Sequence, residues 1–298
     1  MKAAAASLLF AFVSISVLAQ SADNDHDRGT GMERAPVNGG EVEYEVRGRG
    51  EPILFIHGAL VADAFHPLMN EPSLAGYRLI NYHRRGYGAS SAEQGPAEAY
   101  IERHAADAAA LLRDLDMDQA HVVGQSSGAL IALQLALDSP EVVKSLVLLE
   151  VPRPSSDPPF PAAAAARFGK AQQAHDFEEM LNLFVHYRVG PADWETQFED
   201  AVPGSVARAR RYAPTFFQFE APGVTAWRFD DTKAERVRQP LLYVRGGESP
   251  VPKANADEVR AWFPQTEFDV VPGAAHAMHM TAPRVTAEGI VAFLKRHR

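Results

Sequence analysis

The sequence predicts an α/β protein in which a mostly parallel, doubly wound sheet carries an inserted helical cap. Three observations support this fold class. Short β-like runs alternate with helix-like runs along most of the chain, as in proteins built from βα units. Several β-like runs are continuously apolar, which is typical of strands buried on both faces of a sheet. One long segment, 152–238, contains no such run and interrupts the alternation.

The expected elements follow each other in order along the chain. We expect strands at 41–46, 52–57, 77–82, 121–124, 143–151, 240–245 and 267–271. We expect helices at 97–115, 127–138, 255–263 and 283–296. The first helix places its apolar residues on one face. The second is apolar nearly all round, which indicates a buried helix.

The segment 152–238 begins with the proline-rich run PRPSSDPPFP and continues with helix-like stretches rich in aromatic residues. We interpret it as a helical cap inserted into a core formed by 39–151 and 239–298. Most of its aromatic residues are expected to form the interior of the cap. Some of them should line a pocket roof, because pockets form at such junctions and are mostly apolar.

The N-terminus has the layout of a secretory signal peptide over residues 1–19. Lys2 precedes the apolar stretch 3–18, and Val17 and Ala19 are the small residues expected before a cleavage site. A membrane anchor is the alternative, but the stretch is at the low edge of the ~17–25 residues that a span needs. Residues 20–38 are polar and predict a flexible leader. The mature protein is therefore expected to be exported, to the periplasm or the medium.

Composition excludes several classes of function. The 298-residue chain has a formal net charge of −9, which argues against nucleic acid or an anionic membrane as a partner. It has no cysteine, so disulfides, thiol nucleophiles and cysteine metal sites are excluded. Its histidines show no zinc-type spacing such as H-E-x-x-H. We expect no metal, no cofactor and no stable membrane association after signal cleavage.

The strongest chemical signal is the pentapeptide Gly124-Gln125-Ser126-Ser127-Gly128, which lies between an expected strand and an apolar helix. This is the context of the nucleophile elbow G-x-S-x-G. The turn is so sharp that a Cβ at either glycine would collide with neighbouring backbone. Ser126 would then stand at the N-terminus of the helix, where the N–H of Ser127 can donate to a developing oxyanion. Ser127 is a poor alternative nucleophile because the glycines centre on Ser126.

A serine nucleophile needs an adjacent base, because its own pKa is far too high. His276 follows the last expected strand and is the best-placed candidate. His279 is the runner-up, although a pocket-lining or solvated role suits it better. The reaction class that these residues favour is acyl transfer.

Further loops complete a resemblance to the α/β-hydrolase superfamily, which covers roughly residues 40–298 apart from the cap. His57-Gly58-Ala59 ends an apolar strand and resembles the family's HG loop. Residues 83–90 (HRRGYGAS) resemble its D-x-R-G-x-G-x-S loop, with His83 where aspartate is usual. Residues 272–276 (PGAAH) resemble its G-x-G-H loop. The resemblance implies that the N–H of Ala59, with Gly58 as fallback, completes the oxyanion hole with Ser127. For His57 and the 83–90 loop it implies structural roles.

The resemblance leaves two candidates for the acid that orients His276. The usual position lies after the strand 240–245, where the sequence reads GGESP and places Ser249 at the expected aspartate. Glu248 stands beside it. The other known position is the end of the strand after the elbow, where LLEVP places Glu150. We favour Glu150 and keep Glu248 as the runner-up.

A closer likeness, to the zearalenone-type lactone hydrolases, rests on Ser126-Ser127-Gly128-Ala129, Glu150-Val151-Pro152 and the loop that leads to His276. It implies cleavage of carboxylic esters or lactones through an acyl-enzyme on Ser126, without a cofactor. Two alternatives stay open. A non-catalytic binding protein of the same fold would explain the missing aspartate at Ser249. A cofactor-free C–C hydrolase or perhydrolase would share the same triad.

Overall fold

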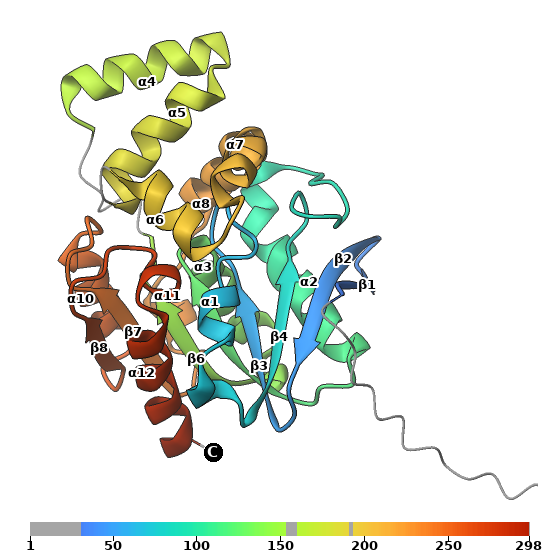
Figure 1. Ribbon diagram of the computed structural model, residues 1–298. Coiled ribbons are helices and arrows are strands. Elements are labelled where there is room, and N and C mark those ends of the chain that lie inside the picture. The colour runs from blue at the N-terminus through green and yellow to red at the C-terminus, as the bar shows by residue number, and fades with distance from the viewer. Residues whose placement is uncertain (1–30, 153–159, 191–192, 298) are drawn as a thin grey trace, which may run out of the picture. The chain divides into compact units, whose positions relative to one another are not determined.

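The computed structural model describes residues 31–152, 160–190 and 193–297. These residues contain a sheet of eight strands (Figure 1). The predicted signal peptide lies outside them. The strand order is β1-β2-β4-β3-β5-β6-β7-β8. The strands are β1 (Glu33–Val37), β2 (Gly40–Arg47), β3 (Glu51–Ile56), β4 (Tyr77–His83), β5 (Ala120–Gln125), β6 (Val143–Leu149), β7 (Leu241–Gly246) and β8 (Glu267–Val271). The pairs β1–β2 and β2–β4 are antiparallel, and every pair from β4 to β8 is parallel.

Helices cover both faces of the sheet because successive residues of its central strands point to opposite faces. In β3, Leu54 and Ile56 pack in one hydrophobic cluster and Ile53 and Phe55 in another. The first cluster is closed by α2 (Tyr100–Asp114), α3 (Ser127–Asp138) and α10 (Lys253–Trp262). The second is closed by α1 (His66–Met69), α11 (Met278–Thr281) and α12 (Pro283–Arg296). The predicted fold class is therefore confirmed.

The flexible leader predicted for 20–38 is wrong at its end, because Glu33–Val37 forms the edge strand β1. This strand pairs with β2 through a turn at Asn38 and Gly39, where Gly39 has φ +77°. An Asn-Gly pair favours the tight turn of a β-hairpin, and both Ala35 and Val37 are buried. The sequence therefore held a hairpin signal that the polar composition around it obscured.

The segment between β6 and β7 contains helices and no strand in the parts that the structure describes, 160–190 and 193–238. Its elements are α4 (Ala162–Ala174), α5 (Phe177–Phe184), the π-helical turn η4 (Val185–Val189), α6 (Trp194–Ala201), α7 (Ser205–Thr215), the π-helical turn η5 (Phe216–Glu220), α8 (Ala221–Ala226) and α9 (Asp231–Ala234). Aromatic and aliphatic side chains from α5 to η5 form a hydrophobic cluster with Leu60, Val61 and Met280 of the sheet-bearing part. The cap therefore packs directly over the loops that follow β3 and β8.

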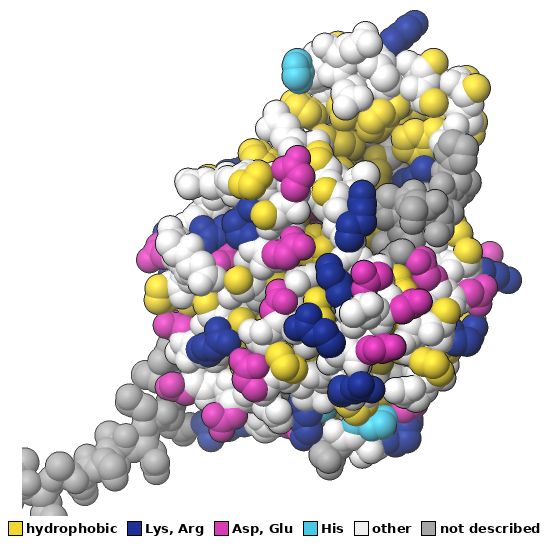
Figure 2. Space-filling view, turned by 180° about the vertical axis from the view of Figure 1, so that it is seen from behind, with side chains coloured by type: hydrophobic (Ala, Val, Ile, Leu, Met, Phe, Trp, Pro, Cys, Tyr) yellow, Lys and Arg dark blue, Asp and Glu magenta, His cyan; other side chains and the backbone are white. Residues whose placement is uncertain are grey.

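Acidic and basic side chains are interspersed over the face of the molecule shown in Figure 2, and hydrophobic side chains gather near the top of that view. Within the described residues, no helix has both the length and the apolar character needed to cross a membrane.

Candidate active site

Ser126 occupies a strained turn between β5 and α3. Its backbone has φ 54° and ψ −122°, a conformation that L-residues rarely adopt and that costs about 1–3 kcal/mol. Its N–H donates to the carbonyl of Leu149, and its carbonyl accepts from the N–H of Ala129. These bonds fix the turn so that the side chain of Ser126 lines a pocket instead of entering the core.

Two glycines make this turn possible because neighbouring backbone atoms lie too close to their Cα atoms to leave room for a side chain. A Cβ at Gly124 would overlap the carbonyl oxygen of Gly128, and a Cβ at Gly128 would overlap the carbonyl oxygen of Ile56 in β3. Both obstacles are backbone atoms, which cannot move aside as the end of a flexible side chain can. The predicted reason for small residues at these two positions matches the geometry.

His276 and Glu150 form a buried pair beside Ser126. Nδ1 of His276 lies 2.6 Å from Oε2 of Glu150, and the two side chains are 8% and 0% exposed. His276 comes from the loop after β8, whereas Glu150 follows β6 with φ 51°. The carboxylate fixes the proton of the imidazole on Nδ1, so Nε2 is left as the basic nitrogen.

Two further donors hold the Glu150 carboxylate. The N–H of Gly246 donates to Oε1 at 2.9 Å, and the hydroxyl of Ser249 donates to Oε2 at 2.7 Å. The runner-up, Glu248, is exposed on the rim. The structure thus brings Glu150 to His276, and it uses Ser249, at the position expected for aspartate, as a hydrogen-bond donor to that glutamate.

Nε2 of His276 lies 3.1 Å from Nε2 of Gln125, the residue before the nucleophile. The Gln125 amide therefore donates to the basic nitrogen in this structure. Hydrogen bonds between catalytic groups are often long in the absence of substrate and tighten when it binds. Ser126 and His276 line the same two pockets, so both face the space where a substrate would react.

Ala59 and Ser127, whose N–H groups are the predicted oxyanion donors, line the same pocket as Ser126 and His276. Ala59 follows β3 and is partly exposed, whereas Ser127 is the first residue of α3 and is buried. Neither N–H group has an acceptor among the residues that the structure describes. The fallback donor Gly58 is buried, and a Cβ there would overlap the Gln125 side chain.

The remaining histidines near the site differ in their environments. His57 is fully buried between the N–H of Arg84, which donates to Nε2, and the carbonyl of Gly58, which accepts from Nδ1. Burial, with a smaller effect of Arg84, lowers the pKa of His57 well below its usual value. Burial also acts on His83, but Asp63 and Glu43 outweigh it and raise its pKa.

His279 lines the inner part of the pocket and is 1% exposed. Neither of its ring nitrogens has a hydrogen-bond partner among the described residues. Burial, with a smaller effect of His276, lowers its pKa to about 3. It is therefore a neutral, pocket-lining residue at ordinary pH, and the structure does not bring it to Glu150.

A cavity of 490 Å³ opens above the nucleophile. Its walls include Ser126 and His276, and its roof includes Phe184 of α5 and Phe216 of η5. A smaller inner pocket of 40 Å³ continues from Ser126 among apolar side chains of the cap. The arrangement suits a ligand with a polar reacting group and an apolar body. Within the described residues, no group of three or more histidine and carboxylate side chains is placed to hold a metal ion.

Sequence reasoning missed three residues that touch this site. In the sequence, Gln125 is only the variable residue of the elbow motif, and Ser249 marks only the absence of the usual aspartate. Glu220 of η5 is fully buried and hydrogen-bonded to Ser127. Its one sequence signal was its isolation as a carboxylate in the run FFQFE.

Comparison with known proteins matches residues 51–283 to the alpha/beta hydrolase fold family. A relative from Bacillus subtilis described as "uncharacterized hydrolase YraK" is 38% identical over 113 residues, which are 37% of this chain and 41% of that protein's length.

Two solved structures resemble this chain along almost its whole length. An esterase from Thermogutta terrifontis shares 23% identity with a TM-score of 0.69, over 90% of this chain and 99% of the esterase. Est816, described as an N-acyl homoserine lactone degrading enzyme, shares 24% identity with a TM-score of 0.68, over 88% of this chain and all of its own. At these identities the likeness is one of fold.

Proposed function

This chain belongs to the alpha/beta hydrolase fold family, and from that premise we propose that it is a serine hydrolase that cleaves carboxylic esters or lactones through an acyl-enzyme on Ser126. The observation that carries the proposal is the 2.6 Å contact between His276 Nδ1 and Glu150 Oε2 beside Ser126. A buried carboxylate that orients an imidazole next to an elbow serine is the constellation that acyl transfer needs. We assign Glu150, not Glu248, as the triad acid.

The first half of the reaction forms the acyl-enzyme. His276 Nε2 takes the proton of Ser126 as Oγ bonds to the substrate carbonyl carbon, and the carbonyl oxygen becomes an oxyanion. The N–H groups of Ala59 and Ser127 donate to that oxyanion, and each such donor contributes about 3–4 kcal/mol to transition-state stabilisation. Glu150 stabilises the imidazolium. His276 then gives the proton to the departing alkoxide oxygen as the carbon–oxygen bond breaks.

The second half releases the acid. A water molecule gives a proton to His276 as its oxygen attacks the acyl carbon, and the second oxyanion is held by the same two N–H groups. The bond to Ser126 breaks, and His276 returns the proton to Oγ. With a lactone the alcohol stays attached to the acyl group, so one hydroxy acid leaves.

The sequence likeness to zearalenone-type lactone hydrolases favours lactones within this substrate class. The cavity volume of 490 Å³ and its aromatic roof favour a substrate with a sizeable apolar part. Est816 is described as a lactone-degrading enzyme and the Thermogutta terrifontis protein as an esterase, so the same fold carries both activities.

The deciding experiment measures acid release by pH-stat from linear esters and lactones matched in size. The mature protein is compared with Ser126→Ala and with Ser139→Ala, whose serine lies at the other end of α3. We expect acid release by the mature protein and by Ser139→Ala but not by Ser126→Ala. Faster release from lactones than from matched linear esters would assign the lactonase class.

A second measurement tests the covalent step independently of substrate choice. An alkyl fluorophosphonate should add one phosphonyl group to the mature protein and none to Ser126→Ala, as intact mass spectrometry would show. Acid release that survives Ser126→Ala would overturn the proposal. Binding of esters without release or labelling would favour the non-catalytic binding protein instead, and carbon–carbon cleavage or peracid formation would favour the third alternative.

We also propose that the protein has a core formed by 39–151 and 239–298, extended to β1 at its N-terminal edge, with 152–238 as the cap.

We further propose that the protein is exported and that its signal peptide is cleaved after Ala19. Intact mass of the protein recovered from the periplasm and from the medium would test it. The expected result is the mass of a chain that begins at Gln20, and a full-length membrane-bound chain would contradict it.

A further inference from the structure

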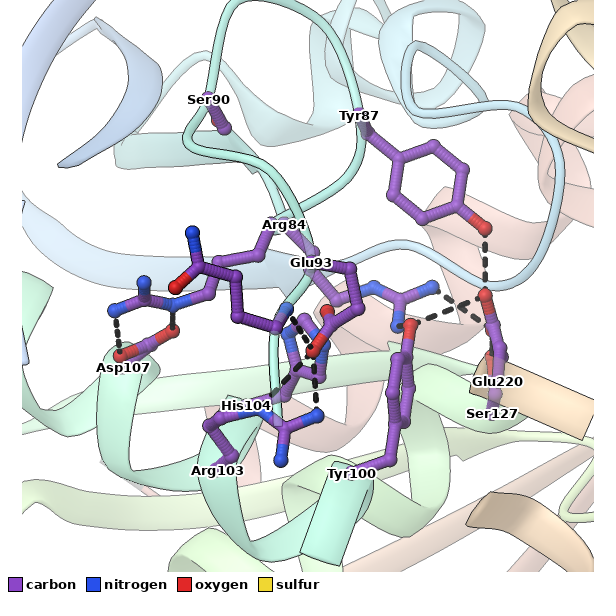
Figure 3. Close-up of polar contacts among 12 residues, drawn as sticks. Arg84, Tyr87, Ser90, Glu93, Tyr100, Arg103, His104, Asp107, Ser127 and Glu220 are labelled. Carbon is purple, nitrogen blue, oxygen red and sulfur yellow. Dashed lines mark hydrogen bonds and ion pairs between the residues drawn. The ribbon is translucent and has the colours of Figure 1, made fainter. Parts of the chain in front are cut away.

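Glu220 is a fully buried carboxylate of the cap that contacts Ser127, the residue after the elbow serine (Figure 3). It ends the π-helical turn η5, an element found frequently at functional sites. Four donors from the sheet-bearing part converge on it: the Ser127 hydroxyl, the Tyr87 hydroxyl at 2.5 Å, the Tyr100 hydroxyl at 3.2 Å and Nη2 of Arg84 at 3.0 Å. The proposed mechanism does not use Glu220, although one of these donors belongs to the oxyanion hole.

Arg84 links Glu220 to the first oxyanion donor. Nη2 of Arg84 also donates to the carbonyl of Gly58 at 2.8 Å, and Nδ1 of His57 donates to the same oxygen at 2.7 Å. That carbonyl belongs to the peptide unit that carries the N–H of Ala59. Since a peptide unit is planar, fixing its carbonyl also fixes the direction of its N–H.

A second link reaches the same loop through Tyr87. The N–H of Leu60 donates to the Tyr87 hydroxyl at 3.2 Å, and that hydroxyl donates to Glu220. Leu60 has φ 72°, a left-handed conformation that is unfavourable for leucine. The hydrogen bond therefore holds the residue after Ala59 in a conformation that it would otherwise leave.

The second oxyanion donor is linked to Glu220 directly. The Ser127 hydroxyl donates to Oε1, so the residue whose N–H faces the oxyanion is held at its side chain as well. Both arms of the oxyanion hole, from the loop after β3 and from the start of α3, thus depend on one carboxylate.

Charge at this position is balanced. Burial alone would raise the pKa of Glu220, but Arg84 and the hydroxyls of Ser127 and Tyr87 outweigh it and lower the pKa below its usual value. The carboxylate is therefore ionised, and the fully buried guanidinium of Arg84 neutralises it. The pair can position the oxyanion donors without placing net negative charge beneath a developing oxyanion.

We propose that Glu220 is a positioning residue for the oxyanion hole, by which the cap aligns the N–H groups of Ala59 and Ser127 through Arg84, Tyr87 and the Ser127 side chain. The inference rests on the proposed function, since it assigns a role in stabilising that reaction's oxyanion. It predicts that loosening these contacts lowers kcat and leaves substrate affinity nearly unchanged, because the contacts matter most in the transition state.

The test uses Tyr87→Phe, Ser127→Ala and Glu220→Gln in the full mature protein, with Tyr82→Phe as the matched control. Tyr82 of β4 is equally buried, but its hydroxyl has no hydrogen-bond partner among the described residues and so takes no part in the Glu220 cluster. We expect kcat to fall about 10- to 50-fold in the first two variants, less than the 10²–10³-fold that loss of a donor causes. KM should change less than about twofold.

Phenylboronic acid provides a readout that a purely structural role would not move, because its adduct on Ser126 places an oxygen in the oxyanion hole. Its inhibition constant should rise in parallel with the loss of kcat in Tyr87→Phe and Ser127→Ala. Tyr82→Phe should keep kcat and boronate affinity within about twofold, because it leaves the Glu220 cluster intact. If Glu220→Gln fails to fold because Arg84 loses its counter-charge, the hydroxyl variants still decide the outcome.

Unchanged kcat in both Tyr87→Phe and Ser127→Ala would overturn the inference, and so would an equal loss of kcat in Tyr82→Phe. These results are distinct from failure of the proposed function, which would appear as acid release that survives Ser126→Ala. Acid release that survives Ser126→Ala would show that no oxyanion forms on Ser126, so it would overturn both the proposed function and the role of Glu220.

Discussion

The hydroxyl of Ser249 donates a 2.7 Å hydrogen bond to Oε2 of Glu150, the same oxygen that lies 2.6 Å from Nδ1 of His276. The serine stands where the family resemblance places the acid, and it donates to a carboxylate that follows the neighbouring strand β6. A carboxylate that accepts from Ser249, Gly246 and His276 has most of its acceptor capacity used. Glu150 therefore contacts His276 in place of the missing aspartate.

The choice between the two glutamates can be tested by matched amide substitutions. Glu150→Gln should lower kcat about 10³- to 10⁴-fold, because the amide no longer stabilises the imidazolium or fixes its tautomer. Glu248→Gln should stay within about twofold, since Glu248 is exposed and makes no contact with His276 in the structure. Steady-state kinetics on one ester would decide, and a greater loss in Glu248→Gln would reverse the assignment.

The Ser249 contact predicts a smaller, separable effect. Ser249→Ala should lower kcat about tenfold and stability by about 1–3 kcal/mol, because a buried carboxylate oxygen loses one of its donors. Ser249→Thr keeps the hydroxyl and should recover most of both. Kinetics and urea unfolding of the two variants check this, and equal losses in Ala and Thr would show that side-chain volume, not the hydroxyl, matters.

Two glycines in helices should respond in opposite ways to alanine. Gly128→Ala should lower stability by about 3 kcal/mol, since its Cβ would overlap the backbone carbonyl of Ile56. Gly169→Ala in α4 should raise stability by about 0.5–1 kcal/mol, because the site has no atom within 4 Å of the new Cβ and alanine is the better helix former. Denaturant unfolding measures both. A tolerated Gly128→Ala would contradict the close packing of the elbow.

The buried His279 predicts a loss of stability in acid. Its folded pKa of about 3 lies below the usual 6.5, so between these values the unfolded chain binds more protons. Stability is therefore lost as pH falls below 6.5, by about 1.4 kcal/mol per pH unit from this group.

The contribution of His279 is isolated with His279→Met, which replaces the titrating ring with an apolar side chain. Urea unfolding at pH 7 and pH 5 should show a difference smaller by about 2 kcal/mol than in the unsubstituted protein. The window stays above the usual range of carboxylates, whose own contributions are lost at lower pH. An identical pH difference in both proteins would place the acid sensitivity in other histidines.

Buried regular elements were predictable because their hydrophobic patterns are strong. The run 52–57 gave β3, and the apolar stretch after Ser126 gave α3 with the bounds that the structure has. The π-helical turns Val185–Val189 and Phe216–Glu220 were not predictable, since no side-chain pattern distinguishes them from continuous α-helix. β1 was missed for a different reason, because it is a short edge strand beside a polar leader.

The residues of the candidate site also differ in whether a local sequence pattern could identify them. Ser126, His276 and Glu150 could be chosen from local motifs, since each ends or follows a recognisable strand. Glu220 could not, because it meets Arg84 across 136 residues of sequence and only the packing of the cap brings them together. Gln125 was visible in the motif, but the rotamer that sends its amide to His276 is a property of the folded site.

The buried Arg84–Glu220 pair also limits how a chain of this kind can acquire a new cap. A chimera that exchanges α4 and α5 would alter the roof above Ser126 and leave the pair intact. A chimera that exchanges η5 and α8 as well would leave the buried guanidinium of Arg84 without its counter-charge, unless the donor segment brought its own carboxylate. The outer helices are therefore free to diverge with the substrate, while the inner ones must be inherited together with Arg84, Tyr87 and Ser127.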